Sequence, residues 1–572
     1  MRKTWKTGLV FLSAAVLLAG CGQKEERAAV NAAETTAAES KAEEAAKEEN
    51  EDNGNEVAAI EGAVNILLSD DGITVDGKAI SENMEDAVYA ANDIVYYEGG
   101  KDFTYGEGSE KDEHSKEEAD AHTVVHITKP GTYAVSGQIS AGQLAIDLGE
   151  DAVEDPDAVV TLILNGVDIN CSVAPGVIFY NVYECGEKDE ETASKDVDTS
   201  AAGANVVIAD GTENNITGSY VARIYKSVEL NEEGTEVVDS KKLHKYDAAF
   251  YSRMTMNVDG GEEGTGVLNI KAENEGLDSE LHLTINGGTI NITSGNDGIN
   301  TNEDYVSVTT INGGTLKIQV DGTTGEGDGI DSNGWLVMNG GTVIAEACGF
   351  SPDAGIDSDM GIHINGGTVI ATGNMLDPIS ESEQPFAVFT FAERQDSGAN
   401  YTLKDAEGNE ILSFSPENDF TNLIMSDADM AVGDYTLWMD ETQLAGAEVE
   451  GGRGGFGGEF GGTPEGMTPP EKPEGFDPNN MPEGMTPPEK SEGFDPNNMP
   501  EEMTPPEKPE GFDSSNMPEG VAPPDDGDAG QRPQGGRPGD GRGGHGDGGD
   551  VEKSETFRII EGGSYFGQVD TK

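Results

Sequence analysis

The stretch from Leu277 to Ile370 contains a pentapeptide that returns at a nearly constant interval. Ile285-Asn286-Gly287-Gly288-Thr289 recurs with its first residue at Ile311, Met338 and Ile364, at offsets of 26, 27 and 26 residues. A fixed period of this length is typical of solenoids and propellers. Because a propeller blade needs four strands in about 40–50 residues, the shorter interval favours a solenoid.

Each repeat reads as three short strands, which in the first unit span 281–285, 289–293 and 298–301. Apolar residues alternate along these strands, and glycines supply the positive φ that sharp corners need. We therefore predict an all-β fold, a right-handed parallel β-helix with three strands per rung and a β cap. One rung has an extra residue near Val308–Ile311, which predicts a bulge.

A second, acidic motif alternates with the pentapeptide. In Asn296-Asp297-Gly298-Ile299-Asn300 and its counterparts the apolar residue should point inward, so that its polar neighbour points outward. Stacked rungs place such side chains about 4.8 Å apart. Carboxylates at that spacing repel each other, and Ca²⁺ centred between two rungs could contact one on each. The candidate metal ligands are Asp278, Glu280, Asp297, Asn300, Asp328, Asp331, Asn333, Asp353, Asp357 and Asp359.

Two features make an array of cation sites more plausible than a catalytic centre. The only Lys or Arg between Leu281 and Pro378 is Lys317, so no ion pair within the repeats offsets the repulsion. The motif also recurs in four rungs, whereas a catalytic site occurs once. The alternative is that the Asp and Asn side chains only cap turns. If the motif instead forms a catalytic centre, the alternative function is that of a polysaccharide lyase or hydrolase.

Trp335 is the candidate carbohydrate-binding residue. Because Leu336 matches the inward Leu283, Trp335 should point outward, where its ring could stack on a sugar. The alternative is contact with the corner loop Asp321–Gly327. His282 and His363 lie on different rungs without a nucleophile and are expected to be surface residues.

The N-terminus is typical of an exported lipoprotein. Residues 1–21 combine a basic start, a short apolar stretch and Leu18-Ala19-Gly20-Cys21, which resembles a lipobox with Cys21 as the lipidated residue. Residues 22–59 form an Ala/Glu-rich tether expected to be disordered. We therefore expect a lipid-anchored monomer on the extracellular face of the bacterial membrane. Of the remaining cysteines, Cys171 and Cys185 either pair or stay free.

Composition limits the partners and divides the rest of the chain. Of the 572 residues, 110 are acidic and 34 are Lys or Arg, and the resulting net charge of −76 excludes binding to nucleic acid by phosphate neutralisation. Residues 60–445 are the expected β-helix domain with acidic insertions. Residues 446–552 are a Gly/Pro-rich insertion with 18-residue repeats, either a linker or a ligand for a partner, as in an adhesin or wall scaffold. Residues 553–572 regain strand character and are expected to pack on the cap.

Several segments together resemble a bacterial carbohydrate-binding β-helix family. They are Gly131-Thr132-Tyr133-Ala134-Val135-Ser136-Gly137, Leu162-Ile163-Leu164-Asn165-Gly166-Val167, Ile208-Ala209-Asp210-Gly211-Thr212-Glu213-Asn214 and the alternating repeats. The resemblance covers about Thr123 to Leu444. It implies a fold similar to pectate lyases, bound calcium, binding of cellulose or polygalacturonate, and no lyase activity. Asn300 and Ala354 occupy positions at which the equivalent residues of the other repeats are acidic.

Overall fold

The computed structural model of the protein describes residues 59–231, 233–449 and 553–571. The predicted signal peptide with Cys21, almost all of the tether and nearly all of the Gly/Pro-rich insertion lie outside these residues. Within them the chain is nearly all β, which confirms the predicted class. The helical elements are short: α2 (Lys116–Asp120) and the 3₁₀ helix η1 (Glu150–Glu154). No helix in this part of the chain has the length and apolarity needed to cross a membrane.

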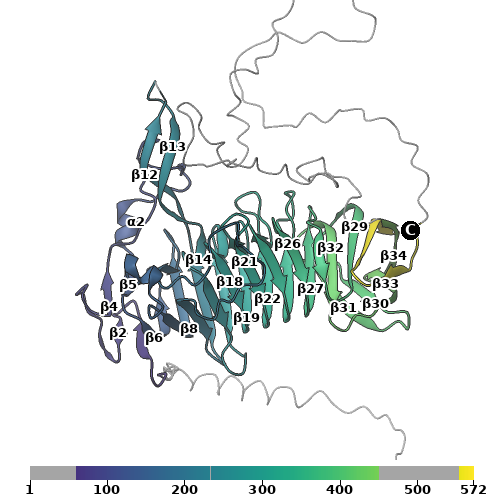
Figure 1. The fold of residues 1–572 in the computed structure, drawn as a ribbon, viewed down its shortest axis with the longest axis horizontal. Helices are drawn as coiled ribbons and strands as arrows, with labels where there is room; N and C mark the ends of the chain where they lie inside the picture. Colours follow the sequence, from purple (N-terminus) through teal and green to yellow (C-terminus); the bar gives the residue numbers. More distant parts are fainter. Residues whose placement is uncertain (1–58, 232, 450–552, 572) are drawn as a thin grey trace, which may run out of the picture. The chain divides into compact units, whose positions relative to one another are not determined.

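The repeats pair strand for strand with one another, in parallel (Figure 1). The first ladder follows β1 (Val64–Leu68) and β6 (Gly131–Ile139) and contains β8 (Val160–Cys171), β10 (Ala204–Ile208), β15 (Met256–Asp259), β18 (His282–Ile285), β21 (Val308–Ile311), β24 (Trp335–Met338), β26 (Gly361–Ile364) and β28 (Ile379–Ser382). The second, which also starts at β8, contains β11 (Glu213–Gly218), β16 (Val267–Ala272), β19 (Thr289–Ser294), β22 (Thr315–Val320), β25 (Thr342–Glu346) and β27 (Thr368–Gly373).

The third ladder forms a separate eight-stranded sheet. Its strands are β4 (Val88–Ala91), β5 (Thr123–Ile127), β7 (Gly142–Asp147), β9 (Val177–Asn181), β14 (Ala248–Ser252), β17 (Glu275–Ser279), β20 (Ile299–Thr301) and β23 (Ile330–Ser332). All pairs in it are parallel except β4 with β5. An isolated parallel bridge from Ile330 to Ile356 extends it by one rung.

Identical positions of successive repeats stack, as the pentapeptide period predicts. Asn312, Asn339 and Asn365 each donate a side-chain hydrogen bond to the asparagine one rung before, over 2.8–2.9 Å. The second glycine of each Gly-Gly pair has φ between 81 and 87°, which only glycine adopts without strain. The predicted bulge at Val308–Ile311 is wrong. β21 pairs with both neighbours without a register shift, because the extra residues lie in the turn between Thr301 and Val308.

One continuous apolar core lies between the three ladders. Leu277, Ile299, Ile330 and Ile356 are each fully buried in it, so the inward assignment of these residues is confirmed. A smaller cluster covers the outward side of β9 and β14, where Ile178 and Tyr251 pack with Ile94 and Tyr97, which follow β4, and with Tyr246 at the end of a later hairpin. No residue of β17 belongs to this apolar cluster, so the apolar packing on the outward side stops before the site.

The hairpin that supplies part of this cover is β12 (Val221–Leu230) with β13 (Val237–Tyr246), drawn projecting above β14 in Figure 1. Two further short strands, β2 (Thr74–Val75) and β3 (Lys78–Ala79), extend β1 antiparallel.

A cap of mostly antiparallel strands with its own aromatic-rich core closes the last rung, where β32 pairs with β27. Its strands are β29 (Phe386–Gln395), β30 (Tyr401–Lys404), β31 (Glu410–Phe414), β32 (Phe420–Asp427), β33 (Gly433–Met439), β34 (Thr442–Val449), β35 (Phe557–Ile559) and β36 (Ser564–Thr571). β35 pairs with β33, and β36 pairs with β29 and β34. This arrangement leaves β27, the last parallel strand of the second ladder, without an open edge, which limits pairing with other chains.

Candidate functional site

The outward side of the third ladder changes from apolar to acidic at β17. In strand register, Ile178 of β9 and Tyr251 of β14 are followed by Asp278, Asn300 and Asp331. Asp357 follows Ile356 in the next rung. We call Asp278, Asn300, Asp331 and Asp357 the acidic strip.

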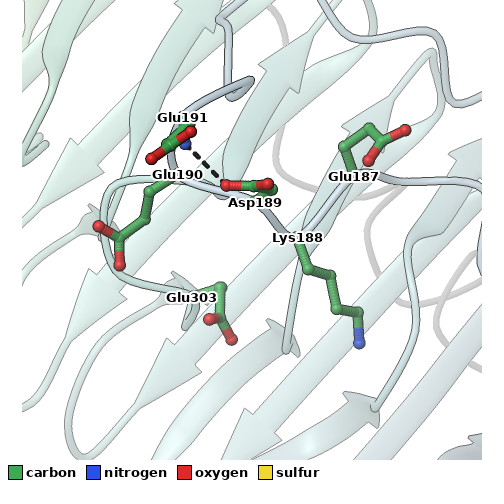
Figure 2. Close-up of a pocket in the computed structure, with 6 residues that line it drawn as sticks. All are labelled: Glu187, Lys188, Asp189, Glu190, Glu191 and Glu303. Carbon is green, nitrogen blue, oxygen red and sulfur yellow. Dashed lines mark hydrogen bonds between the residues drawn. The ribbon is translucent and has the colours of Figure 1, made fainter. Parts of the chain in front are cut away.

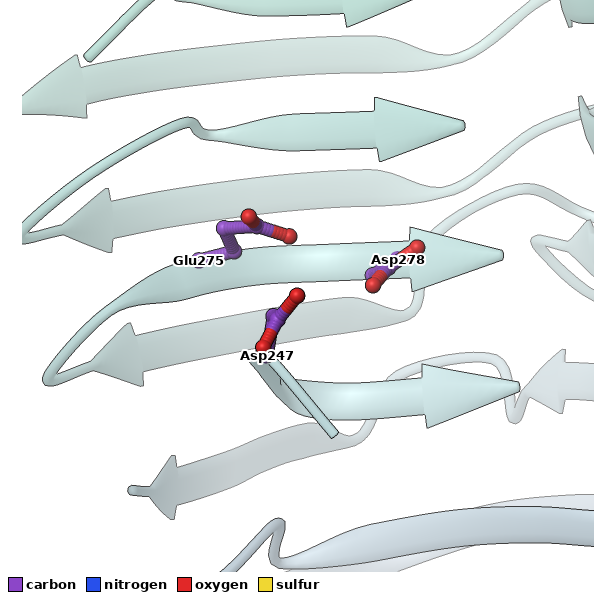
Figure 3. Close-up of side chains that lie close together, drawn as sticks. All are labelled: Asp247, Glu275 and Asp278. Atoms are coloured by element: carbon purple, nitrogen blue, oxygen red, sulfur yellow. The ribbon is translucent and has the colours of Figure 1, made fainter. Parts of the chain in front are cut away.

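Three carboxylates gather at the first rung of the strip (Figure 3). Asp247, just before β14, and Glu275 and Asp278 of β17 each offer an oxygen within 4.8 Å of the others, and all three residues are buried. Glu275 Oε2 and Asp278 Oδ2 have no hydrogen-bond partner. The other oxygen of Asp278, Oδ1, accepts a hydrogen bond from Asn302 Nδ2 over 2.7 Å. We call Asp247, Glu275 and Asp278 the three-acid cluster.

Lysines from the end of β13 border this cluster. Lys245 Nζ lies 2.6 Å from Asp247 Oδ2, and Lys242 Nζ lies 3.0 Å from Glu280 Oε1. The prediction that the repeats supply no ion pair is not contradicted, yet lysines from outside the repeats offset part of the repulsion at the first rung. The lysines come from the hairpin, which lies outside the repeats, and only the fold brings them to the strip.

The pKa values separate the paired from the unpaired acids. Burial, followed by the charges of neighbouring acids, raises the pKa of Glu275 and of Asp278 well above their usual values. Burial also acts to raise the pKa of Glu280. Lys242 and the hydroxyl of Tyr251, which donates to Glu280, outweigh it and lower that pKa. Glu280 is thus a satisfied ion-pair partner, whereas in the three-acid cluster Asp247 alone has a positive partner, Lys245.

The later rungs hold a second group of acids with raised pKa values. Burial is the main cause in each case, and neighbouring carboxylates add to it. The pKa is raised to about 7 for Asp297, about 9 for Asp328, about 8 for Asp331, about 6 for Asp357 and about 7 for Asp377. Asp377 follows the repeats and has no counterpart in the motif, so the sequence did not indicate it.

Three of the predicted ligands, which lie in the turns before the strip strands, also cap turns, as the alternative interpretation expected. Asp297 Oδ1 accepts from the backbone N–H of Asp328 over 2.7 Å, and Asp328 Oδ1 accepts from that of Ala354 over 2.5 Å. Asp353 Oδ2 accepts from the N–H of Gly327 over 2.8 Å. Each of these acids therefore ties one rung to the next with one oxygen.

The other predicted ligands differ in their exposure. Asp278 and Asn300 point away from the core yet are buried, so their outward direction does not place them in solvent. Asn300 Oδ1 is a further buried oxygen without a partner. Asn333 is half-buried and donates to the carbonyl of Asn302, and Asp359 is exposed. Asp247 was missed because it precedes the repeats and belongs to no recognisable motif.

Three further sequence-based expectations concern individual side chains. Trp335 is half-buried, between Val308 and Gly361 of the adjacent strands. His282 and His363 were expected at the surface, but both are buried. Cys171, Cys185 and Cys348 are free thiols, so the first two do not pair.

A second acidic surface lies where the loop after β9 faces the turn after β20 (Figure 2). It is formed by Glu187, Lys188, Asp189, Glu190, Glu191 and Glu303. All six residues are exposed, and Asp189 Oδ1 accepts from the backbone N–H of Glu191 over 3.0 Å. Solvated carboxylates lack the cost of burial that the acids of the three-acid cluster carry. We therefore do not include this surface in the site.

Comparison with known proteins places this geometry in a family. The family model described as "Carbohydrate-binding domain-containing protein" matches residues 119–408, a range that includes the three-acid cluster and the whole acidic strip. The chain belongs to this family. Among solved structures, a polysaccharide lyase-like protein from C. thermocellum, in its gadolinium derivative, is 20% identical. The match covers 53% of this chain and 92% of that chain with a TM-score of 0.30. No curated protein matches the sequence.

Proposed function

We propose that the protein binds an acidic polysaccharide through divalent cations, Ca²⁺ first among them, held by the acidic strip and the three-acid cluster. The observation that carries the proposal is the pair of buried carboxylate oxygens without partners, Glu275 Oε2 and Asp278 Oδ2. A buried ionised group is costly unless it is paired or coordinates a metal. Membership of the carbohydrate-binding family supplies the class of ligand.

The charges at the three-acid cluster match one divalent cation. Three ionised carboxylates and the ammonium group of Lys245 leave a net charge of −2. Hard cations such as Ca²⁺ prefer carboxylate and amide oxygens, which are the groups present here. Asn300 Oδ1 offers a further buried oxygen on the next rung. The donor set therefore fits Ca²⁺ better than a softer metal, which would favour nitrogen or sulfur ligands.

The later rungs supply ligands with less cover. Asp331 and Asp357 are half-buried, and Asp359 is exposed. A cation bound by these side chains would keep coordination positions open toward solvent. A sugar carboxylate can take such a position, so the cation would link two anions that otherwise repel each other. Trp335, at the edge of the same rungs, offers an aromatic surface to a sugar ring.

One observation favours the lyase alternative, and another argues against it. Lys245 lies beside the three-acid cluster, where a basic residue could remove a proton from a bound sugar. However, the carboxylates of Asp247 and Glu275 outweigh the effect of burial and raise the pKa of Lys245 above its usual value. A lysine that stays protonated at neutral pH cannot accept a proton. We therefore propose binding without catalysis.

The fold and the location complete the proposal. The three ladders are best explained as a right-handed parallel β-helix with three strands per rung, whose stacked corners create the strip. Cys21 would carry the lipid that anchors the chain to the extracellular face of the membrane, with residues 22–59 as the tether. A monomer is sufficient, because all proposed ligands belong to one chain.

Calorimetric titration with polygalacturonate tests the function. We expect binding in the presence of CaCl₂ and its loss in EDTA. Neutral cello-oligosaccharides serve as the uncharged control. Equal affinity for polygalacturonate in CaCl₂ and EDTA would contradict the cation link. Release of unsaturated products, followed by absorbance, would favour the lyase instead.

A further inference from the structure

Two strongly exposed aromatic side chains lie at opposite edges of the acidic strip. Tyr305 is 51% exposed and belongs to the turn between β20 and β21. Phe350 is 61% exposed and belongs to the turn between β25 and Ile356. Tyr305 follows its strip strand and Phe350 precedes the strip residues of a rung two further on, so the two turns border the strip on opposite sides.

Tyr305 is held in a backbone conformation that tyrosine rarely adopts. Its φ is +60°, in the left-handed region that glycine and asparagine enter far more readily than bulky residues. The N–H of Tyr305 donates to the carbonyl of Asn333 over 2.5 Å, which fixes the turn against the following rung. Strain of this kind persists where the surrounding structure imposes it, and it is concentrated at binding sites.

Phe350 packs one part of its ring and leaves the rest in solvent. Its ring lies over Gly322 of the preceding rung, where a Cβ atom would come within 2.8 Å of Phe350 Cζ. Because Gly322 has no Cβ atom, it leaves the room in which the ring sits, and its φ of +67° also favours glycine. The same corner contains Asp353, whose carboxylate ties Gly327 to this rung. The ring therefore has a defined support at the edge of the acids.

We propose that Tyr305 and Phe350 are further sugar-stacking residues of the site besides Trp335, and that one linear, carboxylate-bearing polysaccharide crosses the acidic strip from one ring to the other. This inference rests on the proposed function and specifies how the ligand lies. A pyranose ring has an apolar face that packs on an aromatic ring, while its polar groups stay free for cations and water. A strand advances about 3.3 Å per residue, and β20 and β23, which carry strip residues, are each three residues long. Measured along the strand, the distance across the strip with its flanking turns is therefore roughly 10–20 Å. A single sugar would reach only one of the two rings.

The test compares Tyr305→Asn and Phe350→Ala with Phe103→Ala, an aromatic side chain of similar exposure, 49%, outside the strip. Polygalacturonate affinity is measured by calorimetry in CaCl₂, Ca²⁺ affinity by titration without polymer, and Tm by scanning calorimetry. We expect the Tyr305 and Phe350 variants each to lose about tenfold in polymer affinity, with Ca²⁺ affinity unchanged. The Phe103 variant should bind as the wild type.

Tyr305→Asn separates a binding role from a structural one. Asparagine tolerates the left-handed backbone, so the Tm of this variant should stay the same or rise while polymer affinity falls. A fall in Tm that accompanies the loss of affinity would overturn the stacking role. Wild-type polymer affinity in both Tyr305→Asn and Phe350→Ala would overturn the inference and leave the proposed function intact. A wild type that binds Ca²⁺ but no polymer would overturn both.

Discussion

Lys245 Nζ lies 2.6 Å from Asp247 Oδ2, so one carboxylate of the three-acid cluster has a positive partner while Glu275 and Asp278 each keep a buried oxygen without one. The ammonium group comes from a hairpin and the carboxylates from the ladder. The cluster is therefore partly neutralised by the fold itself. The remaining charge is what a divalent cation would meet.

Replacing the lysine should make the protein more dependent on the cation. In Lys245→Met, three carboxylates remain without a positive neighbour, so the free energy of unfolding in EDTA should fall by about 1–2 kcal/mol, a value reduced because the lysine is partly exposed. Ca²⁺ affinity should rise, since no ammonium group competes for Asp247. Urea unfolding and calcium titration measure the two effects. Lys226→Met, on the same hairpin and exposed, is the control and should change neither.

Asp278→Asn should have the opposite effect on the cation-free protein. The substitution removes a buried carboxylate with an unpartnered oxygen, so stability in EDTA should increase by about 1–3 kcal/mol. Ca²⁺ affinity should fall at least about tenfold, because an anionic ligand is lost. Thermal unfolding in EDTA and in CaCl₂ provides both readouts. Asp189→Asn on the exposed loop should be neutral, and a destabilised Asp278→Asn in EDTA would argue against a strained cluster.

Stability without a cation should fall as the pH rises. The folded-state pKa values of Asp297, Asp328 and Asp331 are about 7, 9 and 8, above the unfolded value of about 3.9. Between these limits the folded protein holds more protons than the unfolded chain, so protonation stabilises it fully below about pH 4 and progressively less up to about pH 9. Urea unfolding at pH 5, 7 and 9 in EDTA measures the slope.

Two comparisons assign this slope to the strip. CaCl₂ should flatten it, because a bound cation stabilises the ionised carboxylates. The double variant Asp328→Asn, Asp331→Asn should flatten it in EDTA as well. A slope that is identical in the double variant and the wild type would show that other acids cause it.

Shortening one of the stacked, inward-pointing side chains of the third ladder should destabilise the whole domain. Ile330 is fully buried between Ile299 and Ile356, so Ile330→Ala should lower the free energy of unfolding by about 2–5 kcal/mol. Lys317→Ala, on an exposed position of β22, is the matched control. Urea unfolding should show a loss in the first variant and a change within about 0.5 kcal/mol in the second.

Cys21→Ser tests the proposed anchor independently of the fold. Without the thiol no lipid can be attached, so the protein should move from the membrane fraction to the soluble fraction of cells that produce it. Cys185→Ser, at a free thiol inside the folded region, is the control. Retention of the Cys21 variant in the membrane fraction would contradict lipid anchoring.

The sequence by itself determined the strand class, the stacking of repeats and the inward direction of Leu277, Ile299, Ile330 and Ile356. These properties are local or periodic: alternation along a strand separates Ile330 from Asp331, and a constant interval aligns Asn286 with Asn312. Only the tertiary structure decided which acids are buried and which have partners. Burial depends on segments that pack from elsewhere, and neither Asp247 nor Lys245 has a periodic relation to Asp278. The charge left over at the three-acid cluster therefore could not be read from the repeat.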